Sequence, residues 1–162
     1  MDLKAVAYRE LHGQLTGLFA GERNGLANAA NLSALLYEAL PNLNWAGFYF
    51  LQGRELVLGP FQGKVACVRI ALGQGVCGTA AARRETVIVE DVQAFPGHIA
   101  CDAASRSEIV VPLLHKGQLL GVLDLDSPQL ARFDQEDGSG LNALAALLLE
   151  CSDLNRYVDS GG

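Results

Sequence analysis

The sequence has little positive charge and no long apolar segment. It contains 12 Lys and Arg residues against 18 Asp and Glu residues, for a formal net charge of -6. A nucleic-acid-binding surface needs clustered Lys and Arg, so this charge balance argues against that class of function. No apolar run reaches the roughly 18 residues that a membrane-spanning helix needs. We therefore expect a protein that contacts neither nucleic acid nor membrane.

The sequence also lacks a close cysteine pair and a recognisable signal peptide. Its first residues show no basic segment followed by an apolar one, so we expect a cytoplasmic protein, where structural disulfides are rare. The four cysteines are then candidates for free, metal-bound or redox-active thiols. Structural zinc sites usually contain a Cys-x-x-Cys pair, and its absence disfavours a zinc site built from the cysteines and His98.

No linker or internal repeat divides the chain, which predicts one domain over residues 1–162. Helices are predicted over 2–20, from the cap Asn24 to Pro41, and from the cap Asp134 onward. The helical spacing predicts a buried face on the first helix made of Leu3, Ala7, Leu11, Leu15 and Leu18. The corresponding face of the second helix is predicted to comprise Leu26, Ala29, Ala30, Ser33, Leu36, Tyr37 and Leu40.

Between these helices the pattern changes to short strands, predicted at 45–51, 55–58, 67–70 and 86–89. Gly59 and Pro60 are expected to end the second strand. The Gly-rich residues 73–78 predict a turn that opens a short helix ending near Arg83. A hairpin follows, with strands at 108–114 and 118–126. Hairpins imply an antiparallel sheet, so we predict an α+β domain whose N- and C-terminal helices pack together on one face.

One long polar stretch, residues 95–108, lies between two predicted strands. Long loops inside compact domains are uncommon and usually functional. This loop contains Cys101, the one side chain there with real nucleophilic power near neutral pH. We therefore treat Cys101 as the candidate nucleophile and ask whether the rest of the chain builds a site around it.

The hairpin places carboxyl groups near this loop. Asp124 and Asp126 are two residues apart and share one face of a strand. A two-residue turn would put Glu108 opposite Leu125, on the other face. A three-residue loop at 115–117, with Gly117 in the left-handed conformation, would put Glu108 opposite Asp124, and we expect this register. Either the acids face solvent at a strand end, or they cluster and repulsion keeps one of them protonated.

The other candidates have both a structural and a functional interpretation. Cys67, in a predicted strand, has the most core-like pattern, whereas Cys77 follows a Gly-rich turn at a helix start, where the helix dipole would lower its pKa. Any single cysteine is more often a small buried apolar residue, and Cys151 fits that description. Trp45 and Tyr49 share one face of a strand, and either belong to the core or form the wall of a pocket.

Six motifs, taken together, resemble the free methionine-(R)-sulfoxide reductases, a family built on a GAF domain. They are NWAGFY at 44–49, LGPFQGKVAC at 58–67, GVCGTA at 75–80, FPGHIACD at 95–102, SEIVVP at 107–112 and GVLDLDS at 121–127. The match runs from about residue 40 to residue 137. The resemblance implies a GAF fold with the active-site loops on the sheet face opposite the terminal helices.

The resemblance also implies the chemistry and the site. Cys101 would be the nucleophile that forms a sulfenic acid, with Cys67 and Cys77 as resolving thiols; which of them forms the first disulfide stays open. Glu108, a candidate proton donor, would line the substrate pocket with Trp45, Tyr49, Asp124 and Asp126. Thioredoxin would recycle the disulfide, and no metal, flavin or nicotinamide is required. The terminal helices are a candidate homodimer surface. The alternative is a GAF module that binds a small ligand without turnover.

Overall fold

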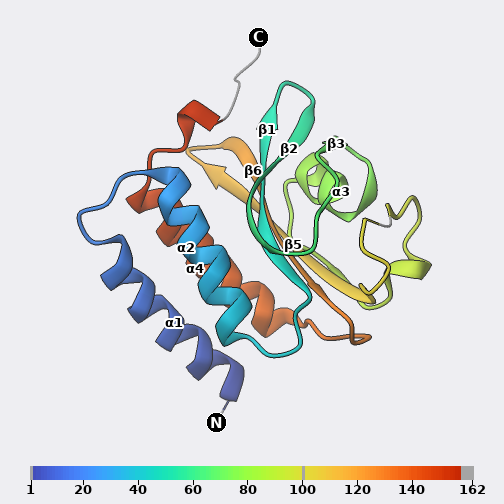
Figure 1. The fold of residues 1–162 in the computed structure, drawn as a ribbon, viewed down its shortest axis with the longest axis horizontal. Helices are drawn as coiled ribbons and strands as arrows, with labels where there is room; N and C mark the ends of the chain where they lie inside the picture. The colour runs from blue at the N-terminus through green and yellow to red at the C-terminus, as the bar shows by residue number, and fades with distance from the viewer. Residues whose placement is uncertain (1, 100, 158–162) are drawn as a thin grey trace.

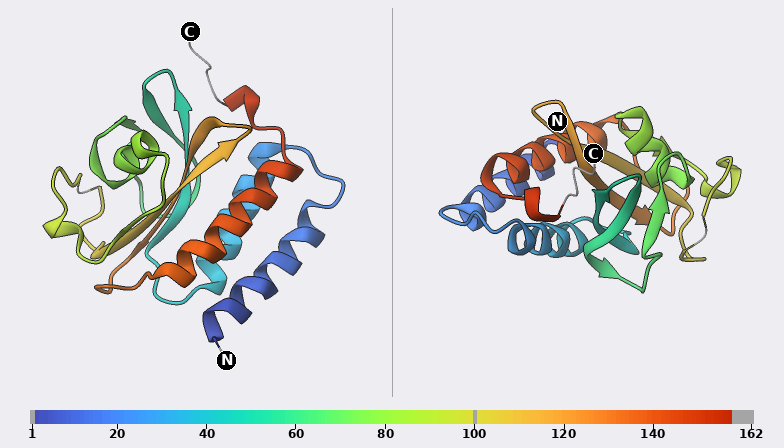
Figure 2. Two further views of the ribbon diagram at one scale, coloured as in Figure 1. Left: turned by 180° about the vertical axis from the view of Figure 1, so that it is seen from behind. Right: turned by 90° about the horizontal axis from the view of Figure 1, so that it is seen from above.

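The fold is a six-stranded antiparallel sheet with helices on both faces. The computed structural model describes residues 2–99 and 101–157. The strands lie in the order β3-β2-β1-β6-β5-β4, and Figure 1 shows α1, α2 and α4 on one face with α3 on the other. Seen from behind and from above, the segment between β4 and β5 lies on the α3 side (Figure 2). This arrangement confirms the predicted α+β architecture with the terminal helices on one face.

The elements follow the predicted order. The helices are α1 Leu3–Phe19, α2 Gly25–Ala39, α3 Gly75–Arg83 and α4 Gln135–Cys151, with 3-10 turns at Val92–Ala94 and Asn155–Tyr157. The strands are β1 Trp45–Gln52, β2 Glu55–Gly63, β3 Arg69–Ala71, β4 Val87–Val89, β5 Ser107–His115 and β6 Gln118–Ser127. Among the helices that the structure describes, none is long and apolar enough to cross a membrane.

The predicted caps begin the helices, because each cap side chain accepts from backbone N–H groups that the first turn leaves unpaired. Asn24 accepts from the backbone N–H of Ala27 at the start of α2. Asp134 forms a capping box with Asp137 at the start of α4. Asp137 is buried and also accepts from the Tyr8 hydroxyl (2.7 Å) and from Lys4 Nζ (2.8 Å). These bonds tie α1 to the start of α4.

The predicted buried faces of α1 and α2 are partly wrong. In α1, Leu11 and Leu15 are buried as predicted, but Leu3 and Leu18 are exposed. Tyr8 and Phe19, which were not predicted, are buried instead. The reason is that α1 packs mainly against α4 rather than on the sheet, so only a narrow stripe is covered. In α2, the buried positions are Gly25, Asn28, Ala29, Leu32, Ser33 and Leu36, whereas Leu26, Ala30 and Tyr37 are exposed.

Two strand predictions also change. β2 does not end at Gly59 and Pro60 but continues to Gly63. The pairing with β1 steps from Tyr49↔Leu58 to Gly47↔Phe61, so β2 contains one extra residue there. Such a bulge tolerates a proline because the ladder is locally interrupted. β3 begins only at Arg69, so Cys67 lies in the segment between β2 and β3 rather than in a strand.

The β5–β6 hairpin corrects the predicted register. Its turn has two residues, Lys116 and Gly117, with φ values of 52° and 77°, and His115 pairs with Gln118. Positive φ at both central residues is the mark of a type I′ turn. The expected three-residue loop is therefore wrong.

A β-bulge places Glu108 on the sheet face where the expected three-residue loop would have placed it. The pairing steps from Leu114↔Leu119 to Leu113↔Gly121, so Leu120 is an extra residue in β6. Glu108 consequently pairs with Asp126, and Asp124 pairs with Val110. Because side chains alternate along a strand, this one-residue shift keeps Glu108 on the face of Asp124 and Asp126. The expected shared face is confirmed, although its cause differs.

Gly121 permits the close contact of β6 with β1 beside this bulge. A methyl group at Gly121 would overlap the carbonyl oxygen of Tyr49, whereas one at Gly13 in α1 would meet nothing within 4 Å. We expect Gly121→Ala to lower the free energy of unfolding by about 1–3 kcal/mol, the usual cost of overpacking. Gly13→Ala should raise it by about 0.5–1 kcal/mol. Urea denaturation with equal m-values measures both changes. If Gly121→Ala left the free energy of unfolding unchanged, β1 and β6 would be able to move apart at this point without cost.

Candidate active site

A cavity of about 50 Å³ lies on the sheet face opposite α1, α2 and α4. Strands β1, β5 and β6 form its floor, and α3 and the loop segments that precede β3 and β5 enclose it. Its lining includes every predicted site residue except Cys67, namely Trp45, Tyr49, Cys77, Cys101, Glu108, Asp124 and Asp126. Residues from four elements and one loop therefore converge, as the predicted site required.

The three carboxyl groups lie together at the floor of this cavity. Glu108 and Asp124 are buried, with exposed fractions of 7% and 5%, and Asp126 is half-buried. Among the described residues that line the cavity there is no Lys or Arg. One oxygen of Asp124, Oδ1, is buried without a hydrogen-bond partner. The floor can therefore accept a cationic group that brings its own hydrogen-bond donors.

The clustered acids shift one another's protonation. Burial raises the pKa of Glu108 well above its ordinary value, and the charges of Asp124 and Asp126 raise it further. Burial and the Asp124 charge likewise raise the pKa of Asp126. Burial also raises the pKa of Asp124, but hydrogen bonds from Glu108, Cys77 and Asp126 oppose that shift. The protonated form of Glu108 is thus favoured, and the hydrogen bonds that Asp124 accepts favour its ionised form.

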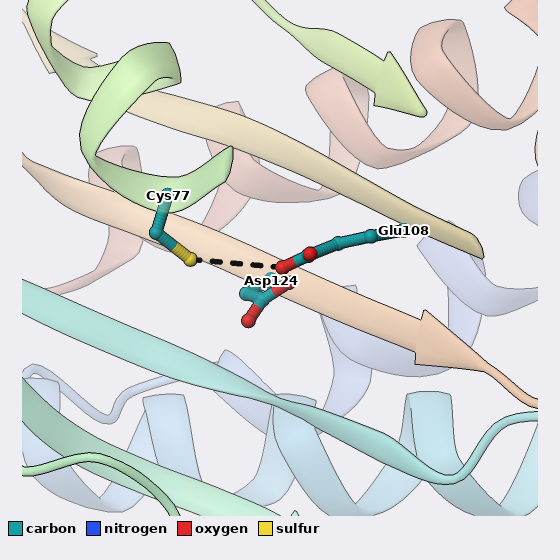
Figure 3. A group of neighbouring side chains, drawn as sticks. All are labelled: Cys77, Glu108 and Asp124. Carbon is teal, nitrogen blue, oxygen red and sulfur yellow. Dashed lines mark hydrogen bonds between the residues drawn. The ribbon is translucent and has the colours of Figure 1, made fainter. Parts of the chain in front are cut away.

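Cys77 lies in the first turn of α3 and points toward Glu108 and Asp124 (Figure 3). Its Sγ donates to Glu108 Oε2 at 3.9 Å. Burial raises the pKa of the Cys77 thiol, and the charges of Asp124 and Glu108 raise it further. The expected lowering by the helix dipole is wrong, because burial beside acids outweighs the dipole. The Cys77 sulfur and one carboxylate oxygen each from Glu108 and Asp124 lie within 4.8 Å of one another, a spacing at which they could together bind a metal ion.

Cys67 and Cys101 are joined by a disulfide bond at the mouth of the cavity. Cys101 is exposed and Cys67 is half-buried. The sequence left open whether Cys67 or Cys77 pairs with Cys101; in the structure the partner is Cys67, and Cys77 is a free buried thiol. Cys151, in α4, is half-buried and free. In this disulfide Cys67 and Cys101 lack the free thiolates that a zinc site shared with Cys77 would need.

The two predicted aromatic residues form a wall of the cavity and also hold the Cys67 segment. Trp45 and Tyr49 are buried and stack with ring centroids 5.9 Å apart. The Tyr49 hydroxyl donates to the carbonyl oxygen of Cys67 (2.9 Å), and Trp45 Nε1 donates to that of Lys64 (3.2 Å). These bonds fix the backbone of the segment between β2 and β3 over the cavity.

Asn44 anchors the Cys101 loop, a role that sequence reasoning missed. Its Nδ2 donates to Asp102 Oδ2 and to Ser105 Oγ, both at 3.0 Å. Asp102 and Ser105 also line the cavity, unlike Asn44 itself. The available signal was the amide side chain of Asn44, directly before the first predicted strand. His98, whose role the sequence left open, is half-buried at the cavity, and burial lowers its pKa, which favours the neutral imidazole.

Comparison with known proteins identifies the family of the chain. The GAF domain family matches residues 29–149. The chain is 58% identical to the free methionine-R-sulfoxide reductase of Escherichia coli, with 97% of each chain covered. It is 50% identical to the enzyme of the same name from Saccharomyces cerevisiae, over 82% of this chain and 78% of that one.

A solved structure shows the same fold. The free methionine-R-sulfoxide reductase of Neisseria meningitidis, in complex with its substrate, superimposes with a TM-score of 0.90 at 48% identity, over 97% of this chain and 95% of that one. The GAF match covers most of the chain, and the two named relatives are 58% and 50% identical to it. The chain therefore belongs to the GAF-domain family and, within it, to the free methionine-R-sulfoxide reductases, which are oxidoreductases.

Proposed function

We propose that this chain reduces free methionine-(R)-sulfoxide to methionine through a sulfenic acid on Cys101. The main supporting observation is the Cys67–Cys101 disulfide at the mouth of a cavity whose floor consists of clustered acids. A disulfide in that position is the product expected after one turnover. The named activity of the Escherichia coli relative and the substrate complex of the Neisseria meningitidis relative support the same reaction.

The chemical steps use the residues around the cavity. The Cys101 thiolate attacks the sulfoxide sulfur while Glu108, kept protonated, gives a proton to the sulfoxide oxygen. The oxygen passes to Cys101, which becomes a sulfenic acid, and methionine leaves. The Cys67 thiol then condenses with the sulfenic acid, forming the disulfide and releasing water. Cys77 is buried and is not part of a disulfide. It acts as a hydrogen-bond donor to Glu108 rather than as the first resolving thiol.

Selectivity for the free amino acid follows from charge. The cavity lining holds three carboxyl groups, and hydrogen bonds from Glu108, Cys77 and Asp126 favour the ionised form of Asp124. The α-ammonium group of a free amino acid supplies both the positive charge and the donors that Asp124 Oδ1 lacks. A methionine sulfoxide within a peptide has no such group. Trp45 and Tyr49 would then pack against the apolar part of the substrate.

Recycling requires two electrons from outside the chain, and thioredoxin, a dithiol protein, is the proposed donor. The direct test measures methionine released from both epimers of free methionine sulfoxide and from the N-acetylated compound, with dithiothreitol as reductant. Release from the free R epimer alone is the expected result. Binding without methionine release would instead identify a GAF module that binds a small ligand, and would overturn the proposal.

The cysteine roles predict three separable defects. Cys101→Ser should abolish even a single turnover. Cys67→Ser should form about one methionine per enzyme and then stop when thioredoxin is the only reductant, because no disulfide can form. Cys77→Ser should keep cycling, since the pair Cys67 and Cys101 remains. Rapid-quench methionine assays distinguish these outcomes, with Cys151→Ser as the matched control; loss of cycling in Cys77→Ser would mean that Cys77 resolves the sulfenic acid.

The proton-donor role predicts a pH signature. The pKa of Glu108 is raised, so its proton is present at low pH and is lost as pH rises through that raised pKa. The single-turnover rate should therefore fall on the alkaline side. Glu108→Gln should slow the chemical step by roughly 10²–10⁴-fold and remove this alkaline limb. Glu150→Gln, an exposed change in α4, is the control. An unaltered rate in Glu108→Gln would rule out the proton-donor role.

The ammonium-binding role predicts a change in KM rather than in the chemical step. Asp124→Asn removes the negative charge, and a charge-assisted hydrogen bond contributes about 1.5–3 kcal/mol. KM for free methionine sulfoxide should rise by roughly 10–100-fold, and the preference over the N-acetylated compound should narrow. Asp153→Asn makes the same charge change at an exposed aspartate that pairs with Arg23. Equal effects of the two variants on KM would contradict the assignment.

A further inference from the structure

The disulfide lies within an exposed apolar rim. Val65 and Val68 flank Cys67 and are 87% and 61% exposed, and Ile99, close to Cys101, is 38% exposed. Three of the nine large apolar side chains that the described part of the chain exposes thus lie within two residues of a disulfide cysteine. Side chains of this kind gathered at one place on a surface commonly mark an interaction site.

A reductant must approach this disulfide from outside the cavity. Cys101 is exposed at the mouth of the cavity, where Val65 and Ile99 also form part of the lining. The thiol of a reducing protein therefore meets the disulfide across the rim. Of the two cysteines, Cys101 is exposed and Cys67 is half-buried, with its carbonyl oxygen held by Tyr49. Cys101 is thus the more exposed of the two disulfide residues.

We propose that Val65, Val68 and Ile99, called here the apolar rim, form the docking surface for the dithiol protein that reduces this disulfide, and that its thiolate attacks Cys101 Sγ. The inference rests on the proposed function in that it assumes the disulfide is recycled. The occupant is a protein of the thioredoxin type, because the rim offers apolar contact area that a small thiol cannot use.

The exchange is balanced in atoms and electrons. The partner's thiolate forms a bond to Cys101 Sγ, and the Cys67–Cys101 bond breaks, so that Cys67 leaves as a thiolate. The partner's second thiol then attacks its own mixed-disulfide sulfur, releasing Cys101 and leaving the partner oxidised by two electrons.

The experiment follows reduction of the oxidised protein itself, without methionine sulfoxide, by thiol labelling and mass spectrometry. Reduced thioredoxin and dithiothreitol serve as alternative reductants. The double variant Val65→Ser/Val68→Ser should lower the rate constant for thioredoxin by roughly tenfold, because apolar contact area is lost. The rate with dithiothreitol should not change. Leu18→Ser, at a side chain in α1 that is 50% exposed, is the matched control and should alter neither rate.

Three results would contradict the proposal that the apolar rim is a docking surface. Equal slowing with both reductants would mean that the valines only shape the surroundings of the disulfide. An unchanged thioredoxin rate in the double variant would exclude the rim as a contact. Failure of wild-type protein to react with thioredoxin would also refute docking, yet it would leave intact any methionine release driven by dithiothreitol, so the two proposals fail separately.

The attacked sulfur is identified by trapping. A thioredoxin variant that lacks its second cysteine cannot complete the exchange and stays bound as a mixed disulfide. Proteolysis and mass spectrometry should find it on the peptide that contains Cys101. A mixed disulfide on Cys67 would contradict the assignment of the attacked sulfur.

Discussion

The candidate site depends on one extra residue in a strand. Leu120 forms a bulge next to a two-residue turn, and this bulge puts Glu108 on the same face as Asp124 and Asp126. Without it, Glu108 would face the helix side, where the apolar core formed by α1, α2, α4 and the sheet could not solvate a carboxyl group. Gly121 allows the neighbouring strand β1 to approach at the same point, which brings Trp45 and Tyr49 alongside the acids.

Around this acidic floor, side-chain hydrogen bonds position the two cysteine segments. Tyr49 and Trp45 hold the backbone that carries Cys67, and Asn44 holds the loop that carries Cys101. All three of these residues belong to β1 or directly precede it. One central strand therefore sets the cavity wall and the positions of both disulfide partners, so that in the proposed reaction substrate binding and thiol chemistry would share a single rigid support.

The electrostatics of the cavity then separate the roles of similar groups. Glu108 and Asp126 have strongly raised pKa values, whereas hydrogen bonds to Asp124 oppose the effect of its burial. The cysteines divide in the same way: Cys101 is exposed at the mouth, and Cys77 is buried against the acids with a raised pKa. In the proposed reaction, burial and neighbouring charge, rather than residue type, would distinguish the proton donor from the carboxylate and the redox thiol from the hydrogen-bond donor.

The sequence by itself determined the element order, the helix caps at Asn24 and Asp134, and seven of the residues that line the cavity, because periodicity and capping are local properties and the six motifs contain those seven residues. Tertiary structure decided the rest. The bulge at Leu120 depends on packing against β1, so turn chemistry alone predicted the wrong pairing. The choice of Cys67 over Cys77 and the reversed pKa shift of Cys77 depend on distances between segments far apart in the chain and on burial, which no local pattern records.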